Sequence, residues 1–155
     1  MKKTRILFVC HGNICRSPMA EFVMKHELKK RGLAERYEVA SAGVSDEEHG
    51  GDIYPPARRM MDAHGIPYHS RHATLLRQCD YAAYEYIIGM DESNMRSMRW
   101  LFGGDPEGKL SMLTAYSGLS RGVADPWYTR DFDSAYADIE QGVKDLCDQL
   151  ENKRA

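Results

Sequence analysis

The chain has 155 residues, which corresponds to one domain and is long enough to bury a hydrophobic core without disulfide staples. Lys and Arg number 21 against 23 Asp and Glu, a balance that argues against a general nucleic-acid binder, because such proteins are basic. Four cysteines are too few for a disulfide scaffold, which leaves these thiols to packing, metal binding or chemistry.

The apolar pattern alternates between strand-like runs and helix-like segments along the chain. In chain order it predicts a strand at 5–9, a helix at 17–31, a strand at 37–41, a helix at 55–63, a strand at 86–90, a helix at 92–101, a strand at 109–113 and a last helix from 132 to 150. The last helix carries one continuous apolar stripe, at Phe132, Tyr136, Ile139, Val143, Leu146 and Leu150.

This order of elements predicts the fold class. Strands that alternate with helices favour a parallel sheet with helices on both faces. We therefore expect a single α/β domain over residues 1–155, a three-layer α/β/α fold with a central four-stranded parallel sheet. Ligands bind such sheets outside the carboxyl ends of the strands, so the end of the first strand, at Val9 and Cys10, is the first place to look for a site.

The sequence shows no signal for export or membrane insertion. The apolar run at 6–10 is too short for a signal peptide, and no stretch approaches the roughly 20 apolar residues that span a bilayer. We therefore expect a cytoplasmic monomer with reduced thiols, with no membrane span and no nucleic-acid partner.

The segment after the first strand predicts an anion site. A loop between a buried strand and a helix that begins near Ser17 directs backbone N–H groups inward, and Gly12 and Asn13 suit its tight turn. Arg16 follows Cys10 by six residues, so its guanidinium can return beside the sulfur and grip two phosphate oxygens. Positive charge and the helix N-terminus favour the Cys10 thiolate, a nucleophile, and Ser17 can donate a hydrogen bond to it.

Other interpretations of these cysteines fit less well. Cys10 and Cys15 lie five residues apart, which is wrong for a redox C-x-x-C motif, and Cys10, His11 and Cys15 lack the usual spacings of zinc ligands. A buried cysteine at a strand end is most often only a core residue, but here the arginine, the serine, the glycine and the helix start occur together. No metal or other cofactor is expected.

These residues carry a resemblance. Residues 10–17 match C-x5-R-S, and 9–21 match the fuller pattern V-C-x-G-N-x-C-R-S-P-x-A-E, of the low-molecular-weight protein tyrosine phosphatases. Further matches, in order along nearly the whole chain, are Ser41-Ala42-Gly43, Met90-Asp91 with Asn94, and Asp125-Pro126-Trp127-Tyr128. The loop signature is highly specific, whereas the other pieces are weak alone.

The resemblance implies a two-step hydrolysis of phosphotyrosine or a small aryl phosphate, with inorganic phosphate as product. Cys10 would attack phosphorus while Arg16 and the loop residues His11, Gly12, Asn13, Ile14, Cys15 and Ser17 bind the phosphate. Asp125 would protonate the leaving oxygen and then activate water. Ile14, Glu47, Trp127 and Tyr128 would contact the substrate, since two aromatic rings beside a carboxylate can form walls for a phenyl ring.

Supporting roles also follow from the resemblance. Asn13, Ser17, a serine like Ser41 and a histidine would hold the loop, and His72 is the candidate histidine, in a stretch that looks locally shifted from the family pattern. Cys15 would form a reversible disulfide with Cys10 under oxidation; the alternative is a packed thiol. Asp91 is either a helix N-cap or part of the site.

The sequence leaves several alternatives open. An arsenate reductase of this fold needs two further cysteines near mid-chain, and only Cys79 is there. Protein-arginine phosphatases of the same family carry threonine in place of Ile14. The isoleucine of this chain packs better against an aromatic ring and therefore favours phosphotyrosine as the substrate. A cysteine-phosphorylated carrier or a phosphopeptide-binding domain would not need Arg16 or Asp125. An acidic run, Ser45-Asp46-Glu47-Glu48-His49, replaces a usually apolar cleft border and favours substrates with basic flanks, unless it is only a solvated charge run.

Overall fold

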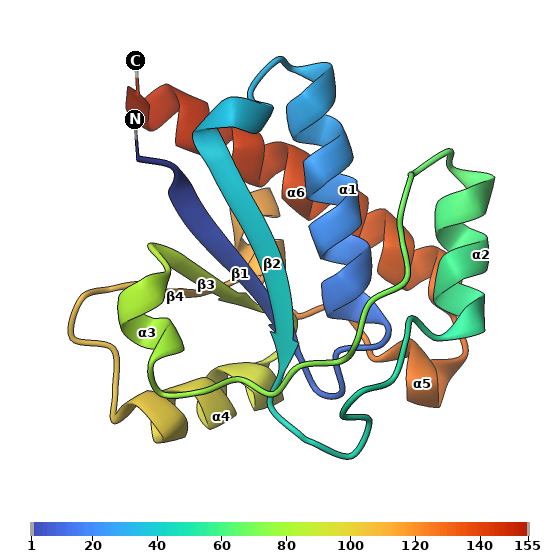
Figure 1. Cartoon of the computed structure of the whole chain (residues 1–155), viewed down its shortest axis with the longest axis horizontal. Helices are drawn as coiled ribbons and strands as arrows, with labels where there is room; N and C mark the ends of the chain where they lie inside the picture. The colour runs from blue at the N-terminus through green and yellow to red at the C-terminus, as the bar shows by residue number, and fades with distance from the viewer. Residues whose placement is uncertain (1, 155) are drawn as a thin grey trace.

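Figure 1 shows the computed structural model, which describes residues 2–154. Its elements in chain order are β1 (Thr4–Cys10), α1 (Arg16–Lys30), the 3-10 turn η1 (Ala34–Arg36), β2 (Tyr37–Gly43), α2 (Pro55–Ala63), α3 (Asp80–Ala83), β3 (Tyr86–Gly89), α4 (Glu92–Phe102), β4 (Leu110–Met112), the 3-10 turn η2 (Leu113–Ser117), α5 (Pro126–Thr129) and α6 (Phe132–Arg154).

The four strands form one parallel sheet in the order β2-β1-β3-β4. Helices α1 and α6 cover one face of the sheet, with α2 packed beside them and further from the strands, and α3 and α4 lie on the other face (Figure 1). The predicted three-layer α/β/α fold is therefore confirmed. β1 is a central strand, so its carboxyl end lies in the middle of the sheet edge, where ligands bind in such folds.

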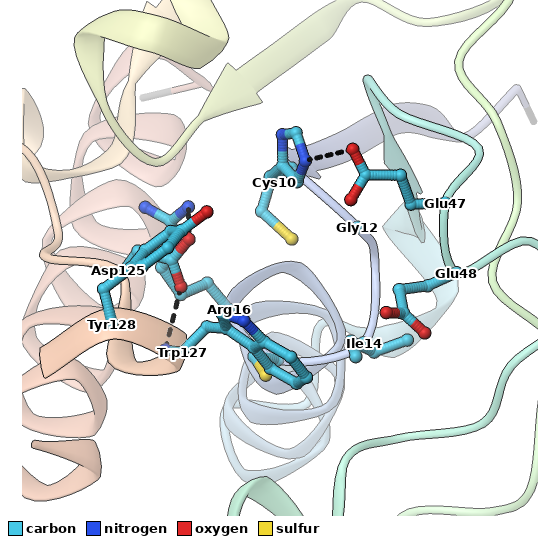
Figure 2. Close-up of a pocket in the computed structure, with 11 residues that line it drawn as sticks. Cys10, Gly12, Ile14, Arg16, Glu47, Glu48, Asp125, Trp127 and Tyr128 are labelled. Atoms are coloured by element: carbon cyan, nitrogen blue, oxygen red, sulfur yellow. Dashed lines mark hydrogen bonds and ion pairs between the residues drawn. The ribbon is translucent and has the colours of Figure 1, made fainter. Parts of the chain in front are cut away.

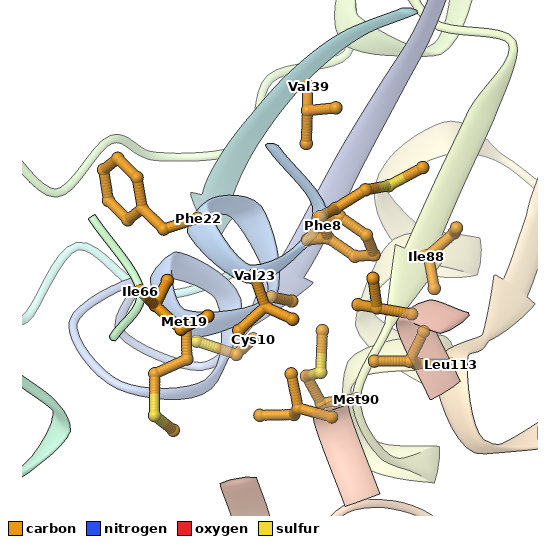
Figure 3. Close-up of a cluster of buried hydrophobic side chains, with 14 of the residues drawn as sticks. Phe8, Cys10, Met19, Phe22, Val23, Val39, Ile66, Ile88, Met90 and Leu113 are labelled. Atoms are coloured by element: carbon orange, nitrogen blue, oxygen red, sulfur yellow. The ribbon is translucent and has the colours of Figure 1, made fainter. Parts of the chain in front are cut away.

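Side chains of β1 alternate between two cores. Ile6 and Phe8 pack with α1 and α6 in the larger core, part of which Figure 3 shows. Leu7 and Val9 point to the opposite face, into a smaller core beneath α4. All four are at most 2% exposed, and burying each such side chain stabilises the fold by about 1.5–3 kcal/mol. Burial on both faces explains the continuous apolar run in the sequence.

Element boundaries differ little from those predicted. Gly32 has a positive φ of 72° just after α1, as expected of a residue that ends a helix. The whole apolar stripe of α6 is buried, and the helix runs on to Arg154. Periodicity did not predict α3 or α5, because four residues make too short a window. None of the helices within residues 2–154 is long and apolar enough to cross a membrane.

Candidate active site

The loop between β1 and α1, residues 10–16, is held from outside by its carbonyl groups. Cys10 O, His11 O and Ile14 O accept hydrogen bonds from the backbone N–H groups of Val44, Ser45 and Tyr54, at 2.9–3.0 Å. In a planar trans peptide the N–H points opposite to the C=O, so the next N–H after each of these carbonyls points into the loop. The loop is thus built to present donors to an anion.

A close backbone contact between the loop and β2 requires Gly43. A Cβ atom at this position would lie 2.8 Å from His11 O and 3.1 Å from Asn13 N, which is too close. Gly43 pairs in register with Cys10 at the ends of β2 and β1. The Ser41-Ala42-Gly43 match in the sequence is therefore explained by the need to bring β2 against the loop.

Asn13 organises the inside of the loop. It has a positive φ of 60°, the left-handed conformation expected from the sequence, and it is 1% exposed. Its Nδ2 donates to Ser17 Oγ at 2.8 Å and to Ser41 Oγ at 2.9 Å. Ser17 Oγ lies 3.0 Å from Cys10 Sγ. The contact that the sequence predicted between Ser17 and Cys10 is present.

Arg16 is buried with its guanidinium beside the loop. The residue is 2% exposed, and its Nη1 donates to Asp91 Oδ2 at 2.7 Å and to Val123 O at 2.8 Å. Burial lowers the pKa of Arg16, but the electrostatic interactions with Cys10 and Asp125 and the hydrogen bond to Asp91 outweigh burial and raise the pKa. Arg16 therefore stays positively charged.

Asp91 holds Arg16 and caps a helix at once. Its Oδ1 accepts from Asn94 N at 2.8 Å at the start of α4, and Asn94 Oδ1 accepts from Asp91 N, which completes a capping box. Its Oδ2 binds Arg16. The sequence left open whether Asp91 is a helix cap or part of the site, and the structure shows that it is both.

Asp125 lies just before α5, and its carboxylate faces Arg16 and the loop between β1 and α1. Its Oδ1 accepts from Trp127 N at 3.0 Å and caps α5, while its Oδ2 lies 3.4 Å from Arg16 Nη2. Pro126 follows at the first helical position, where proline is well tolerated. One carboxylate oxygen is thus held by the backbone, and the other faces the guanidinium.

These groups line one cleft, which Figure 2 shows. Cys10 and Arg16 lie at its base, and Asp125, Trp127 and Tyr128 form one side. The remaining lining residues are His11, Gly12, Ile14, Cys15, Glu47 and Glu48. Trp127 is 39% and Tyr128 is 78% exposed, so both rings are free to contact a substrate that enters the cleft.

Comparisons with known proteins agree with this geometry. The sequence profile described as "Low molecular weight phosphotyrosine protein phosphatase" matches residues 5–155. The low molecular weight protein-tyrosine-phosphatase PtpA of Staphylococcus aureus is 31% identical over 94% of this chain and 92% of its own. The chain belongs to the low-molecular-weight protein tyrosine phosphatase family. It is therefore a phosphatase, which argues against the carrier and binding-domain alternatives.

Two solved structures are close to this chain in shape. YfkJ from Bacillus subtilis has a TM-score of 0.96 at 29% identity and covers 100% of this chain and 99% of its own. The Drosophila arginine phosphatase DARP has a TM-score of 0.84 at 28% identity and covers 94% of this chain and 96% of its own. The proteins similar to this chain therefore include one named as a tyrosine phosphatase and one named as an arginine phosphatase.

The prediction that His72 helps Ser17 and Ser41 to hold Asn13 is wrong. His72 is exposed, and its Nδ1 contacts Gly50 O at 3.0 Å instead of Asn13. The side chain that reaches Asn13 is that of the preceding residue, Arg71, whose Nη2 donates to Asn13 Oδ1 at 2.5 Å. In this structure the guanidinium of Arg71, and not the imidazole of His72, therefore holds Asn13.

The remaining cysteines occupy different environments. Burial raises the pKa of the Cys15 thiol to about 12, and the neighbouring Cys10 acts in the same direction. Burial likewise raises the pKa of Cys147, which packs in the core, to about 12. Cys79 is exposed. Cys15 and Cys147 are therefore protonated thiols at neutral pH.

Tyr54 supports the aromatic side of the cleft, and the sequence analysis did not single it out. Its ring centroid lies 4.9 Å from that of Trp127, and its hydroxyl accepts from Arg130 Nη1 at 3.0 Å. Its backbone N–H binds Ile14 O. Tyr54 thus links the loop between β1 and α1, called the phosphate loop below, to the loop that carries Asp125. No sequence signal points to it, because the contact joins residues more than 70 positions apart.

Proposed function

We propose that this phosphatase hydrolyses phosphotyrosine in proteins, and small aryl phosphates, through a phosphocysteine intermediate on Cys10. The observation that carries the proposal is the cleft itself. It brings the Cys10 sulfur, the buried cation of Arg16, inward-facing loop N–H groups and the Asp125 carboxyl together beside the aromatic side chains of Trp127 and Tyr128.

In the first step the Cys10 thiolate attacks phosphorus, and an S–P bond forms as the P–O bond to the phenol breaks. Arg16 and the N–H groups of the loop hold the nonbridging oxygens, whose charge they stabilise without reorganising. Asp125 gives its proton to the leaving phenolate oxygen. Ser17 donates a hydrogen bond to the sulfur, which favours its anionic form as nucleophile and later as leaving group.

In the second step a water molecule attacks phosphorus, and Asp125, now a carboxylate, accepts its proton. The S–P bond breaks, and inorganic phosphate and the Cys10 thiolate are released. Neither step in this proposal uses a metal or another cofactor. The preferences for basic substrate flanks through Glu47, the cytoplasmic location and the monomeric state stay predictions.

Phosphoarginine is the second candidate substrate, because a neighbour of the same fold is an arginine phosphatase. We expect the wild-type kcat/KM for a phosphotyrosine peptide to exceed that for the matched phosphoarginine peptide by about 10–200-fold, the range over which pockets discriminate related groups. The reason is that Ile14 offers the cleft an apolar side chain, which suits a phenyl ring better than a polar guanidine. Kinetics on the two peptides, with Ile14→Thr beside wild type, give the ratio; faster turnover of phosphoarginine would contradict the proposal.

A further proposal concerns oxidation of the site. Hydrogen peroxide converts the Cys10 thiolate to a sulfenic acid with release of hydroxide, and the Cys15 thiol condenses with it to form a disulfide and water. Both residues line the same cleft, which places the two thiols near each other. The disulfide would prevent irreversible overoxidation of Cys10.

We expect Cys15→Ser to lose most of its ability to regain activity with dithiothreitol after a peroxide pulse, whereas wild type recovers. Cys79→Ser is the matched control, because Cys79 is exposed and lies outside the cleft. The measurement is the fraction of activity recovered per pulse. Equal recovery by wild type and Cys15→Ser would exclude Cys15 as the resolving thiol.

A further inference from the structure

A second guanidinium lies behind the phosphate loop. The Arg71 side chain donates from Nη2 to Asn13 Oδ1 at 2.5 Å and from Nη1 to Gly51 O at 3.3 Å. Both acceptors are neutral oxygens, so these contacts do not neutralise the charge. Both carboxylates near Arg71 have other partners: Glu21 is engaged by Lys25 at 2.6 Å and Ser41 at 2.7 Å, and Asp52 pairs with Arg58 at 3.1 Å. Burial lowers the pKa of Arg71, but a guanidinium remains charged at any physiological pH.

A chain of hydrogen bonds connects Arg71 through Asn13 and Ser17 to the sulfur of Cys10, and each group can donate to the next. Asn13 Oδ1 accepts from Arg71 and from Thr74 N, so the amide must donate through Nδ2, as it does to Ser17 Oγ. Ser17 Oγ can then use its own hydrogen to donate to Cys10 Sγ at 3.0 Å, which is closer than its other acceptor, Ala42 O, at 3.5 Å. Hydrogen bonds in such a chain polarise one another, so a cation at its head strengthens donation at its end.

The same contacts hold the loop in shape. Asn13 has the left-handed conformation that residues other than glycine seldom adopt, and its side-chain amide is the part that Arg71 and Thr74 grip. The segment that supplies this grip is itself anchored, because Arg71 N donates to Asp52 Oδ1 at 3.2 Å and Ala73 N donates to Gly51 O at 2.6 Å. The loop is therefore braced from behind by a fixed segment.

We propose that Arg71 is a positioning residue of the active site, which holds Asn13 and so the phosphate loop, and whose permanent charge stabilises negative charge in the cleft from behind the loop. The proposal rests on the proposed function of Cys10. Arg71 does not line the cleft, and it acts through Asn13 and Ser17.

The test uses Arg71→Met, which removes the charge and both hydrogen bonds, and Arg71→Lys, which keeps the charge but loses the two-pronged contact. Arg59→Met is the matched control, because it makes the same chemical change at an exposed position on α2, outside the cleft. Two readouts need no turnover. They are the affinity for inorganic phosphate and the ratio of the rates at which iodoacetate and iodoacetamide alkylate Cys10, which reports the local positive potential because only iodoacetate is an anion.

For Arg71→Met we expect phosphate to bind about tenfold or more weakly and the alkylation ratio to fall, since the hydrogen bond from the charged guanidinium to Asn13 and the nearby charge are both lost. For Arg71→Lys we expect a ratio close to that of wild type with a severalfold lower kcat/KM. Arg59→Met should match wild type in all readouts.

Wild-type phosphate affinity and alkylation ratio in a folded Arg71→Met would overturn the proposal. If that variant does not fold, Arg71→Lys decides, and a wild-type kcat/KM there would overturn the positioning role. A wild-type enzyme that hydrolyses no aryl phosphate would instead contradict the proposed function, and the alkylation ratio would still report on Arg71.

Discussion

Replacing Cys10 with serine is expected to lower kcat on an aryl phosphate by at least about 10⁴-fold, as loss of a nucleophile does in other hydrolases. A serine hydroxyl is not ionised at neutral pH and forms no phosphocysteine. The loop N–H groups and Arg16 stay in place, so Cys10→Ser should still bind inorganic phosphate. The measurements are steady-state release of p-nitrophenol and calorimetric titration with phosphate.

Cys79→Ser is the matched control for Cys10→Ser, because it makes the same chemical change at an exposed position outside the cleft. It should retain wild-type activity. Phosphate release that persists in Cys10→Ser would show that another group is the nucleophile, and loss of phosphate binding in that variant would show that the sulfur shapes the anion site.

Replacing Asp125 with asparagine is expected to lower kcat/KM for phosphotyrosine by about 10²–10⁴-fold, the usual contribution of a general acid. Asparagine caps a helix as well as aspartate does, so the hydrogen bond from Trp127 N and α5 should survive. The loss should be smaller for p-nitrophenyl phosphate, since its leaving group is a weaker base and needs less protonation.

The pH profile gives a second signature of Asp125. A general acid acts only while protonated, so activity in wild type falls on the alkaline side as the acid ionises, and Asp125→Asn should lack this limb. Asp131→Asn is the control, because Asp131 caps the start of α6 through Ser134 N and lies outside the cleft. An unchanged alkaline limb in Asp125→Asn would assign the acid to another residue.

Much of the fold could be predicted because it depends on patterns of apolar residues within short segments of the sequence. The apolar run of β1 and the stripe of α6 report burial directly, and the order of elements implies the parallel sheet. The loop between β1 and α1 could also be predicted, since Cys10, Arg16 and Ser17 lie in one short segment. Its turn places Asn13 in a left-handed conformation, which asparagine tolerates. Local geometry and local sequence agree there.

The parts that could not be predicted depend on contacts between distant segments. Arg71 and His72 are neighbours, and only the path of the chain decides which of them reaches Asn13. Asp91 was recognisable as a helix cap, but its bond to Arg16 spans 75 positions. Tyr54 meets Trp127 for the same kind of reason. Such pairings are set by packing in three dimensions, on which periodicity and motifs carry no information.

The central claim is that Cys10 carries the phosphoryl group between the two steps. Asp125→Asn is the suitable enzyme for trapping it, because a good leaving group lets phosphorylation proceed while the loss of the base slows attack by water. After rapid quenching of this variant with p-nitrophenyl phosphate, mass spectrometry of the peptides should find one phosphoryl group, on the sulfur of Cys10. A phosphoryl group on Cys15 or Ser17 instead, or release of phosphate with no labelled enzyme at any time point, would contradict the account.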